Sequence, residues 1–414
     1  MSNEKTFQPA LRFNGFEGDW DSYKLIEIGD FKNGMNFGKD ALGHGYPFVN
    51  LQDVFGKNVV DGKYLGLAKS SVNQRKEYSL KKGDILFIRS SVKPEGVGEA
   101  ALVSNDLENT TYSGFMIRFR PQVKMSGNFN RFVFSTRRIR EQILMGATSS
   151  ANTNINQNAL GNIQGYFPKF VEQTQIGNFF QNIDQQLKLH QSKYTKLQQL
   201  KKAMLGKMFP KAGAKVPEVR FAGFSGDWEK KVLGIDIADI IGGGTPNTMD
   251  DRYWDGDIDW YSPTEIGDSP FAFDSVKKIT QLGLSNSSAK KLPAERTILF
   301  TSRAGIGDMA ILKKEATTNQ GFQSLVLKEG FDTYFIYSMG HLIKEYAMRN
   351  ASGSTFLEIS GKLLRNMKVK VPTKHEQTKI GNYFHNLDRL IALQQQHINK
   401  LKNIKQACLE KMFV

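Results

Sequence analysis

Two long stretches of the chain carry hydrophobic residues at alternating spacings of four and three, which is the pattern of a heptad helix. One covers residues 172–208, and a matching block begins at residue 376. Each is expected to form a helix on the order of 55 Å long, at about 1.5 Å per residue. Because the seams match, we expect an antiparallel pair that holds one folded module at each end of a rigid rod. The residues expected to pair the helices are Ile176, Phe180, Ile183, Leu187 and Leu197 with Ile380, Phe384, Leu387, Ile391 and Leu401.

Polar residues interrupt both seams at matching places, His190 with Gln394 and Lys201 with Lys405. A polar residue in a heptad seam can fix the register of two helices. Tolerated positions near the seam edge explain the same pattern, so both interpretations stay open.

Outside these helices, shorter runs alternate hydrophobic and polar residues between turn-forming Gly, Asn, Asp and Pro. Residues 82–89, 114–120 and 324–327 are therefore expected to be strands. Residues 132–144 and 334–349 have the spacing of helices. The pattern predicts an α+β fold, with two pseudo-symmetric mixed α/β modules separated by two long antiparallel coiled-coil helices.

The chain contains an internal repeat. Residues 9–20 recur as residues 217–228 with eight of twelve positions identical, and residues 172–184 recur as residues 376–388. Between these blocks the two halves differ strongly. That is the pattern of one scaffold carrying two different variable surfaces, in the order module, helix, module, helix.

The repeat predicts four segments. The first module covers residues 1–168, and a helical spacer with its linker covers 169–215. The second module covers 216–372, and a C-terminal helical spacer covers 373–414.

The charge balance favours a polyanionic partner. Lys and Arg number 56 against 41 Asp and Glu, for a net charge of +15 and a pI near 9.5. Most of the excess lies in the two helical blocks, where a solvated helix face and a nucleic-acid backbone site are both compatible with it. The basic charge could also serve solubility alone.

Cysteine usage and hydropathy narrow the class further. A single cysteine, Cys408, excludes a disulfide framework and any metal site built from several cysteines. No signal peptide and no membrane-spanning run are expected, so the interpretation is a cytoplasmic protein that contacts no membrane.

Loops that follow predicted strands supply candidate DNA contacts, because Arg, Lys and Ser suit phosphate and base-edge contacts. An ordinary polar loop is the alternative for each, and core packing is the favoured alternative for the aromatic at 261. A basic cluster at residues 137–140 is a further candidate for phosphate contact. The candidates are Arg89, Ser90, Ser91, Lys93, Arg137, Arg138, Tyr261, Ser262, Ser302 and Arg303.

No catalytic constellation is recognisable. There is no Walker loop, the Gly-x-Gly pairs at 96–98 and 305–307 lack a third glycine, and Gly242–Gly244 are interpreted as a turn. The six histidines lack metal-ligand spacing with carboxylate partners. The favoured hypothesis is a non-catalytic DNA-reading subunit. A stand-alone DNA adenine methyltransferase and a coiled-coil adaptor that binds only protein remain as alternatives.

Over essentially its whole length the chain resembles the specificity subunit of Type I restriction–modification enzymes. The similar parts are the run at 298–307, the Asn-Gln-Gly-Phe-Gln run at 319–323 and the two Glu-Gln-Thr helix starts. The first module departs from the pattern, because a longer loop precedes Gly96 and Thr111–Gly114 replace the Asn-Gln-Gly run. The resemblance adds Asn319 and Gln320 to the candidate DNA contacts.

The resemblance implies that each module is a target recognition domain reading one half of an asymmetric, bipartite double-stranded DNA site. The helices would set the gap, and a rod of ~55 Å spans roughly 16 base pairs. Two modification subunits would dock on the chain and bind S-adenosylmethionine for adenine methylation. Restriction subunits would supply ATP-driven, Mg-dependent translocation and cleavage. No cofactor is expected in this chain itself.

Overall fold

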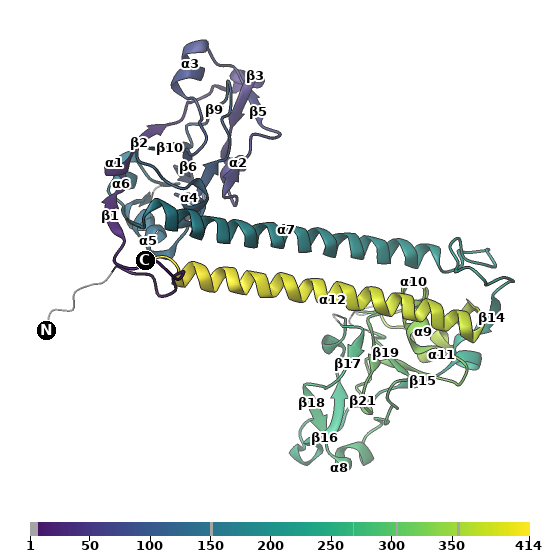
Figure 1. The fold of residues 1–414 in the computed structure, drawn as a ribbon. Coiled ribbons are helices and arrows are strands. Elements are labelled where there is room, and N and C mark those ends of the chain that lie inside the picture. Colours follow the sequence, from purple (N-terminus) through teal and green to yellow (C-terminus); the bar gives the residue numbers. More distant parts are fainter. Residues whose placement is uncertain (1–6, 150–151, 268, 304, 354–356) are drawn as a thin grey trace. The chain divides into compact units, whose positions relative to one another are not determined.

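The computed structural model describes residues 7–149, 152–267, 269–303, 305–353 and 357–414. The chain forms two compact units. Unit 1 combines Met1–His190 with His397–Val414, and unit 2 is the continuous segment Gln191–Gln396. The two long helices, α7 (Phe170–Lys207) and α12 (Lys374–Lys411), each contribute one part to each unit (Figure 1).

Unit 1 is built on a five-stranded sheet in the order β2-β10-β6-β8-β4, a three-stranded sheet β5-β3-β9, a three-stranded sheet β11-β12-β7 and the pair β1-β13. Its strands are β1 (Asp21–Lys24), β2 (Gly29–Asn33), β3 (Leu42–Val49), β4 (Val59–Val60), β5 (Gly66–Ala68), β6 (Ile85–Ile88), β7 (Ser90–Ser91), β8 (Ala100–Val103), β9 (Thr111–Tyr112), β10 (Met116–Pro121), β11 (Thr148–Ser149), β12 (Thr153–Asn154) and β13 (Gln164–Phe167). Its shorter helices are α1 (Leu25–Ile28), α2 (Leu51–Val54), α3 (Val72–Glu77), α4 (Gly127–Val133), α5 (Arg137–Gly146) and α6 (Gln157–Gly161).

Unit 2 repeats this plan with a five-stranded sheet β15-β22-β19-β20-β17, a three-stranded sheet β18-β16-β21 and the pair β14-β23. Its strands are β14 (Glu229–Val232), β15 (Ala238–Gly242), β16 (Trp254–Tyr261), β17 (Phe271–Ala272), β18 (Lys277–Ile279), β19 (Thr297–Phe300), β20 (Met309–Leu312), β21 (Ala316–Thr318), β22 (Gln323–Leu327) and β23 (Lys368–Val371). Its shorter helices are α8 (Gln281–Ser285), α9 (Thr333–Ser338), α10 (Gly340–Asn350) and α11 (Gly361–Arg365).

The pairing directions repeat as well as the strand order. The central strands β6 and β19 are antiparallel to both neighbours, whereas the edge pairs β4–β8 and β17–β20 are parallel. The pairs β3–β9 and β16–β21 are also parallel. The predicted α+β class with two pseudo-symmetric modules and two long helices is therefore confirmed.

Each of the two shorter helices predicted from spacing is in fact two helices. The prediction of one helix over 132–144 is wrong, because α4 ends at Val133 and α5 starts after Thr136, whose backbone is extended. The predicted helix over 334–349 is divided between α9 and α10 at Met339. Gly340 follows there, and it is a poor helix former that lies close against Met309.

The core of each unit combines its module with parts of both long helices. In unit 1, Ile176 and Phe180 of α7 pack in one buried cluster with Met412 and Phe413, which follow α12. In unit 2, Ile380 and Phe384 of α12 occupy the corresponding cluster, and Met208 and Phe209 complete it after α7. Ile183 and Leu387 belong to the same two clusters, and Leu187 and Leu197 pack half-buried against them, while Ile391 and Leu401 are half-buried on α12.

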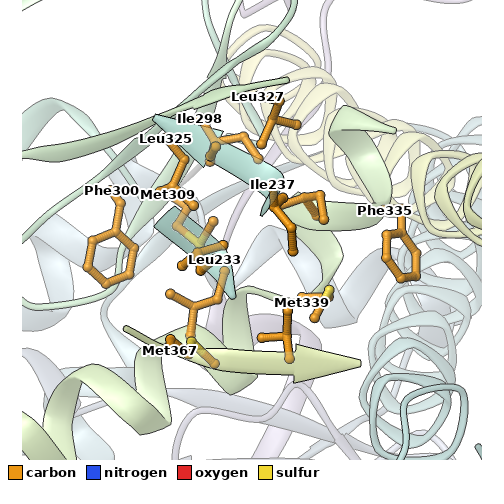
Figure 2. Packing of buried hydrophobic residues seen from close by; sticks show 14 of the residues in the cluster. Leu233, Ile237, Ile298, Phe300, Met309, Leu325, Leu327, Phe335, Met339 and Met367 are labelled. Atoms are coloured by element: carbon orange, nitrogen blue, oxygen red, sulfur yellow. The ribbon is translucent and has the colours of Figure 1, made fainter. Parts of the chain in front are cut away.

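Figure 2 shows part of the unit 2 cluster, with side chains from the sheet and from the surrounding segments converging on one another. Ile298 and Leu325 come from the adjacent strands β19 and β22, and Leu233 and Met367 approach from the segments that flank β14 and β23. Within this cluster the Trp228 ring meets the Phe209 ring edge to face, at 6.2 Å and 88°. Unit 1 has the same contact between Trp20 and Phe413, at 6.3 Å and 87°.

The two long helices run antiparallel in each unit and are joined there by a partly buried ion pair. In unit 1, Lys405 of α12 donates to Asp184 of α7 at 2.6 Å. In unit 2, Lys201 of α7 donates to Asp388 of α12 at 2.5 Å. Both lysines are the residues that interrupt the predicted seams, so their contacts favour the interpretation in which they fix the register of the pair.

Within each unit, the motif at the start of the module contacts the motif at the start of a long helix. Arg12 donates through Nε and Nη2 to the carboxylate of Glu172 at 2.7 and 2.8 Å, and through Nη1 to the carbonyl oxygen of Gly18. Arg220 forms the same two bonds with Glu376 at 2.7 Å each. Each glutamate is almost fully buried. The repeat is therefore maintained by one bidentate ion pair in each unit, joining the start of a module to the start of a long helix.

Candidate nucleic-acid interface

In unit 2, the structure brings together the three segments that carry candidate DNA contacts. β16 ends at Tyr261, and the amide nitrogen of Asn319, just after β21, donates to the carbonyl oxygen of Tyr261 at 3.0 Å. The amide nitrogen of Ser302, just after β19, donates to the carbonyl oxygen of Gly321 at 2.8 Å. Residues separated by up to about sixty positions in the sequence therefore form one edge, where the ends of strands from the five-stranded and the three-stranded sheets lie together.

Burial divides these candidates into two groups. Tyr261 and Ser302 are buried, at 2% and 0% exposure, and Tyr261 belongs to a small hydrophobic cluster. Burial raises the pKa of the Tyr261 phenol. Ser262, Arg303 and Asn319 are half-buried and Gln320 is exposed, so these four can reach a partner without a change in the core. The buried Tyr261 and Ser302 instead anchor the segments that carry these four residues.

The half-exposed residues are fixed by local contacts. The Ser262 amide and hydroxyl both donate to Glu265, each at 2.8 Å. The Asn319 side chain accepts from the amide nitrogen of Gly321 at 2.8 Å, which closes a tight turn around Gln320. The edge therefore presents polar side chains on a rigid backbone, which is the arrangement that base-edge contacts require.

In unit 1, the predicted loop at residues 89–94 is partly a strand. Ser90 and Ser91 form β7, which pairs with β12, and Ser91 is buried. This pairing could not be predicted from local sequence, because the partner strand lies about sixty residues away. Arg89 is half-buried and its amide donates to the carbonyl oxygen of Phe115 at 2.7 Å, the position that Ser302 occupies in unit 2. Lys93 is exposed.

The basic cluster at the start of α5 lies beside this segment, because Arg140 donates to the carbonyl oxygen of Glu95 at 2.6 Å. Arg138 lies over the ring of Tyr166, at 4.2 Å, and donates to its hydroxyl at 2.9 Å. Arg137 is 91% exposed and pairs with Glu141 one turn along the helix. Of the arginines in this cluster, Arg137 therefore has the most accessible charge for a phosphate.

The structure adds an aromatic surface that the candidates did not include. β3 is exposed along its first five residues, and the guanidinium of Arg75 lies 3.6 Å from the ring centroid of Tyr46. In unit 2, the equivalent strand β16 carries Trp254, with the ammonium of Lys277 5.6 Å from its ring. The stacking cations come from elements other than these strands, so sequence spacing alone could not find them.

The strand ladders also correct the alignment of the two modules. Sequence identity aligns Gly114-Phe115 with Gly321-Phe322. The amide of Ser113 donates to the carbonyl oxygen of Val49, as that of Asn319 does to Tyr261, both at 3.0 Å. Gly114 therefore occupies the position of Gln320, one residue away from the alignment by identity.

Neither a membrane-spanning helix nor a metal-binding cluster is present among the described residues. Within them, no helix combines the length and hydropathy needed to cross a bilayer. Among the same residues, His, Cys, Asp and Glu side chains do not gather in groups of three or more that could hold a metal ion.

Comparisons with known proteins identify related chains. A family model described as the Type I restriction modification DNA specificity domain matches residues 17–199 and 225–403. The Type I restriction enzyme MjaIX specificity subunit of Methanocaldococcus jannaschii is 33% identical over 192 residues, or 45% of this chain and 44% of that protein. The aligned part thus spans less than half of that relative. The EcoR124I/EcoR124II specificity subunit of Escherichia coli is 31% identical over 40% of this chain and 42% of its own length.

Longer alignments are weaker in identity. The putative MjaX specificity subunit of Methanocaldococcus jannaschii is 22% identical over 94% of this chain and 91% of that protein. The crystal structure of a Type I restriction–modification S subunit from M. genitalium superimposes with a TM-score of 0.60. It covers 98% of this chain and 99% of that one at 18% identity, a likeness that concerns the fold alone.

Proposed function

The chain belongs to the family of Type I restriction modification DNA specificity domains, and from that premise we propose that it is the DNA-reading specificity subunit of a Type I restriction–modification complex. Each module is a target recognition domain that reads one half of a bipartite, asymmetric site in double-stranded DNA. The long helices set the gap between the two halves.

One observation carries this proposal: the two units share the same fold but have different side chains at the candidate edge. Strand order, strand direction and the arginine–glutamate pair recur in both units. At the candidate edge, Gly114 of unit 1 occupies the position of Gln320 in unit 2, and Arg89 occupies the position of Ser302. Two copies of a protein–DNA module with different contact residues are expected to read different half-sites, so the target is asymmetric.

The charge supports binding to a polyanion. A net charge of +15 gives a long-range attraction for DNA. The exposed cations Lys93 and Arg137 of unit 1 and the half-buried Arg303 of unit 2 suit phosphate contacts. The polar residues beside them suit base contacts. Affinity and sequence discrimination therefore come from different side chains of the same edge.

The reaction chemistry belongs to partner subunits, and this chain is non-catalytic. Two modification subunits bind S-adenosylmethionine and methylate adenine, and restriction subunits use ATP and Mg to translocate and cleave DNA. The complex acts in the cytoplasm. The support in this chain is that each unit repeats the same lysine–aspartate contact between the long helices, so a partner bound in two copies meets equivalent surroundings twice.

The decisive experiment is genome-wide mapping of adenine methylation in a host that expresses this chain with its modification subunit. The expected result is a new bipartite motif with a fixed gap. Exchanging residues 1–165 for those of another specificity chain should change one half of the motif and leave the other half and the gap unchanged.

Two outcomes would contradict the proposal. If the complex assembles, its modification subunit works with another specificity chain, and no new motif arises, the chain is an adaptor that does not specify DNA. If the purified chain methylates DNA without a partner, it is a methyltransferase in its own right. A binding assay provides an independent measurement, because log K for DNA should fall linearly with log salt, at about −0.9 per phosphate contact.

A further inference from the structure

The glycine run that the sequence suggested was only a turn lies directly against the candidate edge of unit 2. A Cβ atom added at Gly243 would lie 2.0 Å from the carbonyl oxygen of Asn319, and one at Gly244 would lie 2.4 Å from the amide nitrogen of Ala289. Only glycine allows backbone segments to approach so closely. The run therefore brings the next residue, Thr245, to the loop that carries Gln320.

Thr245 and Gln320 meet through their side chains. The Thr245 hydroxyl donates to Oε1 of Gln320 at 2.5 Å. Thr245 is half-buried and Gln320 is exposed. A surface glutamine ordinarily samples many rotamers, and losing that freedom on binding lowers affinity. Here one hydrogen bond orders the amide before any partner arrives.

The backbone is fixed on both sides of this bond. Next to Thr245, the amide of Gly244 donates to the carbonyl oxygen of Thr318 at 2.8 Å, and the indole of Trp260 donates to the carbonyl oxygen of Gly244, also at 2.8 Å. On the other side, residues 319 and 321 are held by the hydrogen bonds to Tyr261 and Ser302 described above. Hydrogen bonds to the core of the module thus hold the two segments whose side chains orient the Gln320 amide.

We propose that Thr245 is a positioning residue that orients Gln320 to read one adenine in the half-site of the second module. This inference rests on the proposed function. Thr245 uses one lone pair of Oε1, which leaves the other lone pair free to accept from the amino group on C6 of adenine. The NH₂ group of Gln320 is then free to donate to N7, and this pair of bonds is the recognised glutamine contact with adenine in the major groove.

The first module lacks this device. The position of Gln320 is taken by Gly114, and a Cβ atom there would lie 2.1 Å from Oδ1 of Asn36. The adenine contact should therefore belong to one half-site only, which ties the prediction to a defined half of the motif.

The test uses the chain assembled with its modification subunit and duplexes carrying the motif found by methylation mapping. Each adenine of the second half-site is replaced in turn by 7-deazaadenine, which pairs normally but lacks the N7 acceptor. For the unaltered chain, one position should weaken binding roughly ten-fold at fixed salt. Gln320→Ala should bind the normal and substituted duplexes equally at that position.

Thr245→Val should weaken binding to the normal duplex by roughly three- to ten-fold, without a matching loss on the duplex substituted at that position. Thr245→Ser keeps the hydroxyl and should restore binding to within about two-fold. Thr195→Val is the matched control, because the Thr195 hydroxyl bonds within its own helix, to the carbonyl oxygen of Gln191. Thermal unfolding of all variants should match that of the unaltered complex.

The outcomes separate the two proposals. If the unaltered complex shows no sequence preference, the proposed function fails and this inference fails with it. If the unaltered complex is specific but Thr245→Val behaves like the control, or loses affinity equally for every duplex, the positioning role of Thr245 is refuted while the proposed function stands.

Discussion

Replacing Arg220 with alanine would leave the carboxylate of Glu376 buried without its cation. Glu376 is only 1% exposed, and Arg220 holds both of its oxygens. This hydrogen bonding raises the pKa of the Arg220 guanidinium, which therefore keeps its positive charge. Removing one partner of a buried ion pair costs about 3–5 kcal/mol, because the remaining charge has lost its compensation.

The loss should be confined to unit 2. At about 2–4 °C per kcal/mol for a unit of this size, its unfolding temperature should fall by roughly 6–20 °C. Calorimetry of the purified chain gives the temperature, and hydrogen exchange read by mass spectrometry shows which unit opens. Arg12→Ala is the matched control, because it removes the twin contact to Glu172 and should open unit 1 instead.

The double variant Arg220→Met with Glu376→Leu separates the two possible reasons for a loss. If the penalty comes from an unpaired buried charge, the double variant should be more stable than Arg220→Ala, because neither charge remains. A loss below about 1 kcal/mol for Arg220→Ala would refute the reasoning, since that is the range of exposed ion pairs. Equal losses for the single and double variants would show that geometry, not charge, is what the pair provides.

Three further predictions concern the long helices and their surroundings. Lys201→Met removes the cation that joins Asp388 to the opposite helix and should lower the stability of unit 2 by about 1–3 kcal/mol, measured by urea unfolding. Phe384→Ala empties a fully buried site and should cost about 3–5 kcal/mol by the same assay, whereas Leu393→Ala on the exposed face should cost less than about 0.5 kcal/mol. Burial raises the pKa of Tyr334, so its contribution to stability is present below the unfolded pKa of about 10 and is lost as the pH rises above it. Alkaline titration followed by tyrosine absorbance should show the buried tyrosines of unit 2 ionising only as the unit unfolds. The Tyr334→Phe variant should reduce that step by one tyrosine, because Tyr261 and Tyr337 still contribute to it.

The long helices and the duplicated plan could be predicted from the sequence because both are local or repetitive signals. A heptad seam is visible within forty residues, and an internal repeat needs no structure to detect. The internal repeat did not show that Arg12 and Glu172 contact each other, because it shows only that both motifs occur in each half of the sequence. The strand formed by Ser90 and Ser91 was missed for a related reason: its partner lies far away in the sequence.

The candidate edge was predictable in part. Residue type and position after a strand selected segments that the structure does bring together, at Tyr261, Ser302 and Asn319. Which side chains point outward was beyond the pattern, because Ser302 is fully buried and Gln320, on the neighbouring segment, is exposed. Thr245 was missed because the preceding glycines were interpreted as a turn, and their close packing against Asn319 depends on contacts across the module.

The composition of the two units has a consequence for synthesis on the ribosome. Unit 2 is one continuous segment, whereas unit 1 needs residues 397–414 in addition to residues 1–190. The first module to emerge is therefore the second that can be completed. Until Met412 and Phe413 arrive, the nascent unit 1 exposes the apolar surface around Phe129 and Phe180. The core of unit 1 is therefore completed only by the last residues of the sequence, although its module is the first to be synthesised.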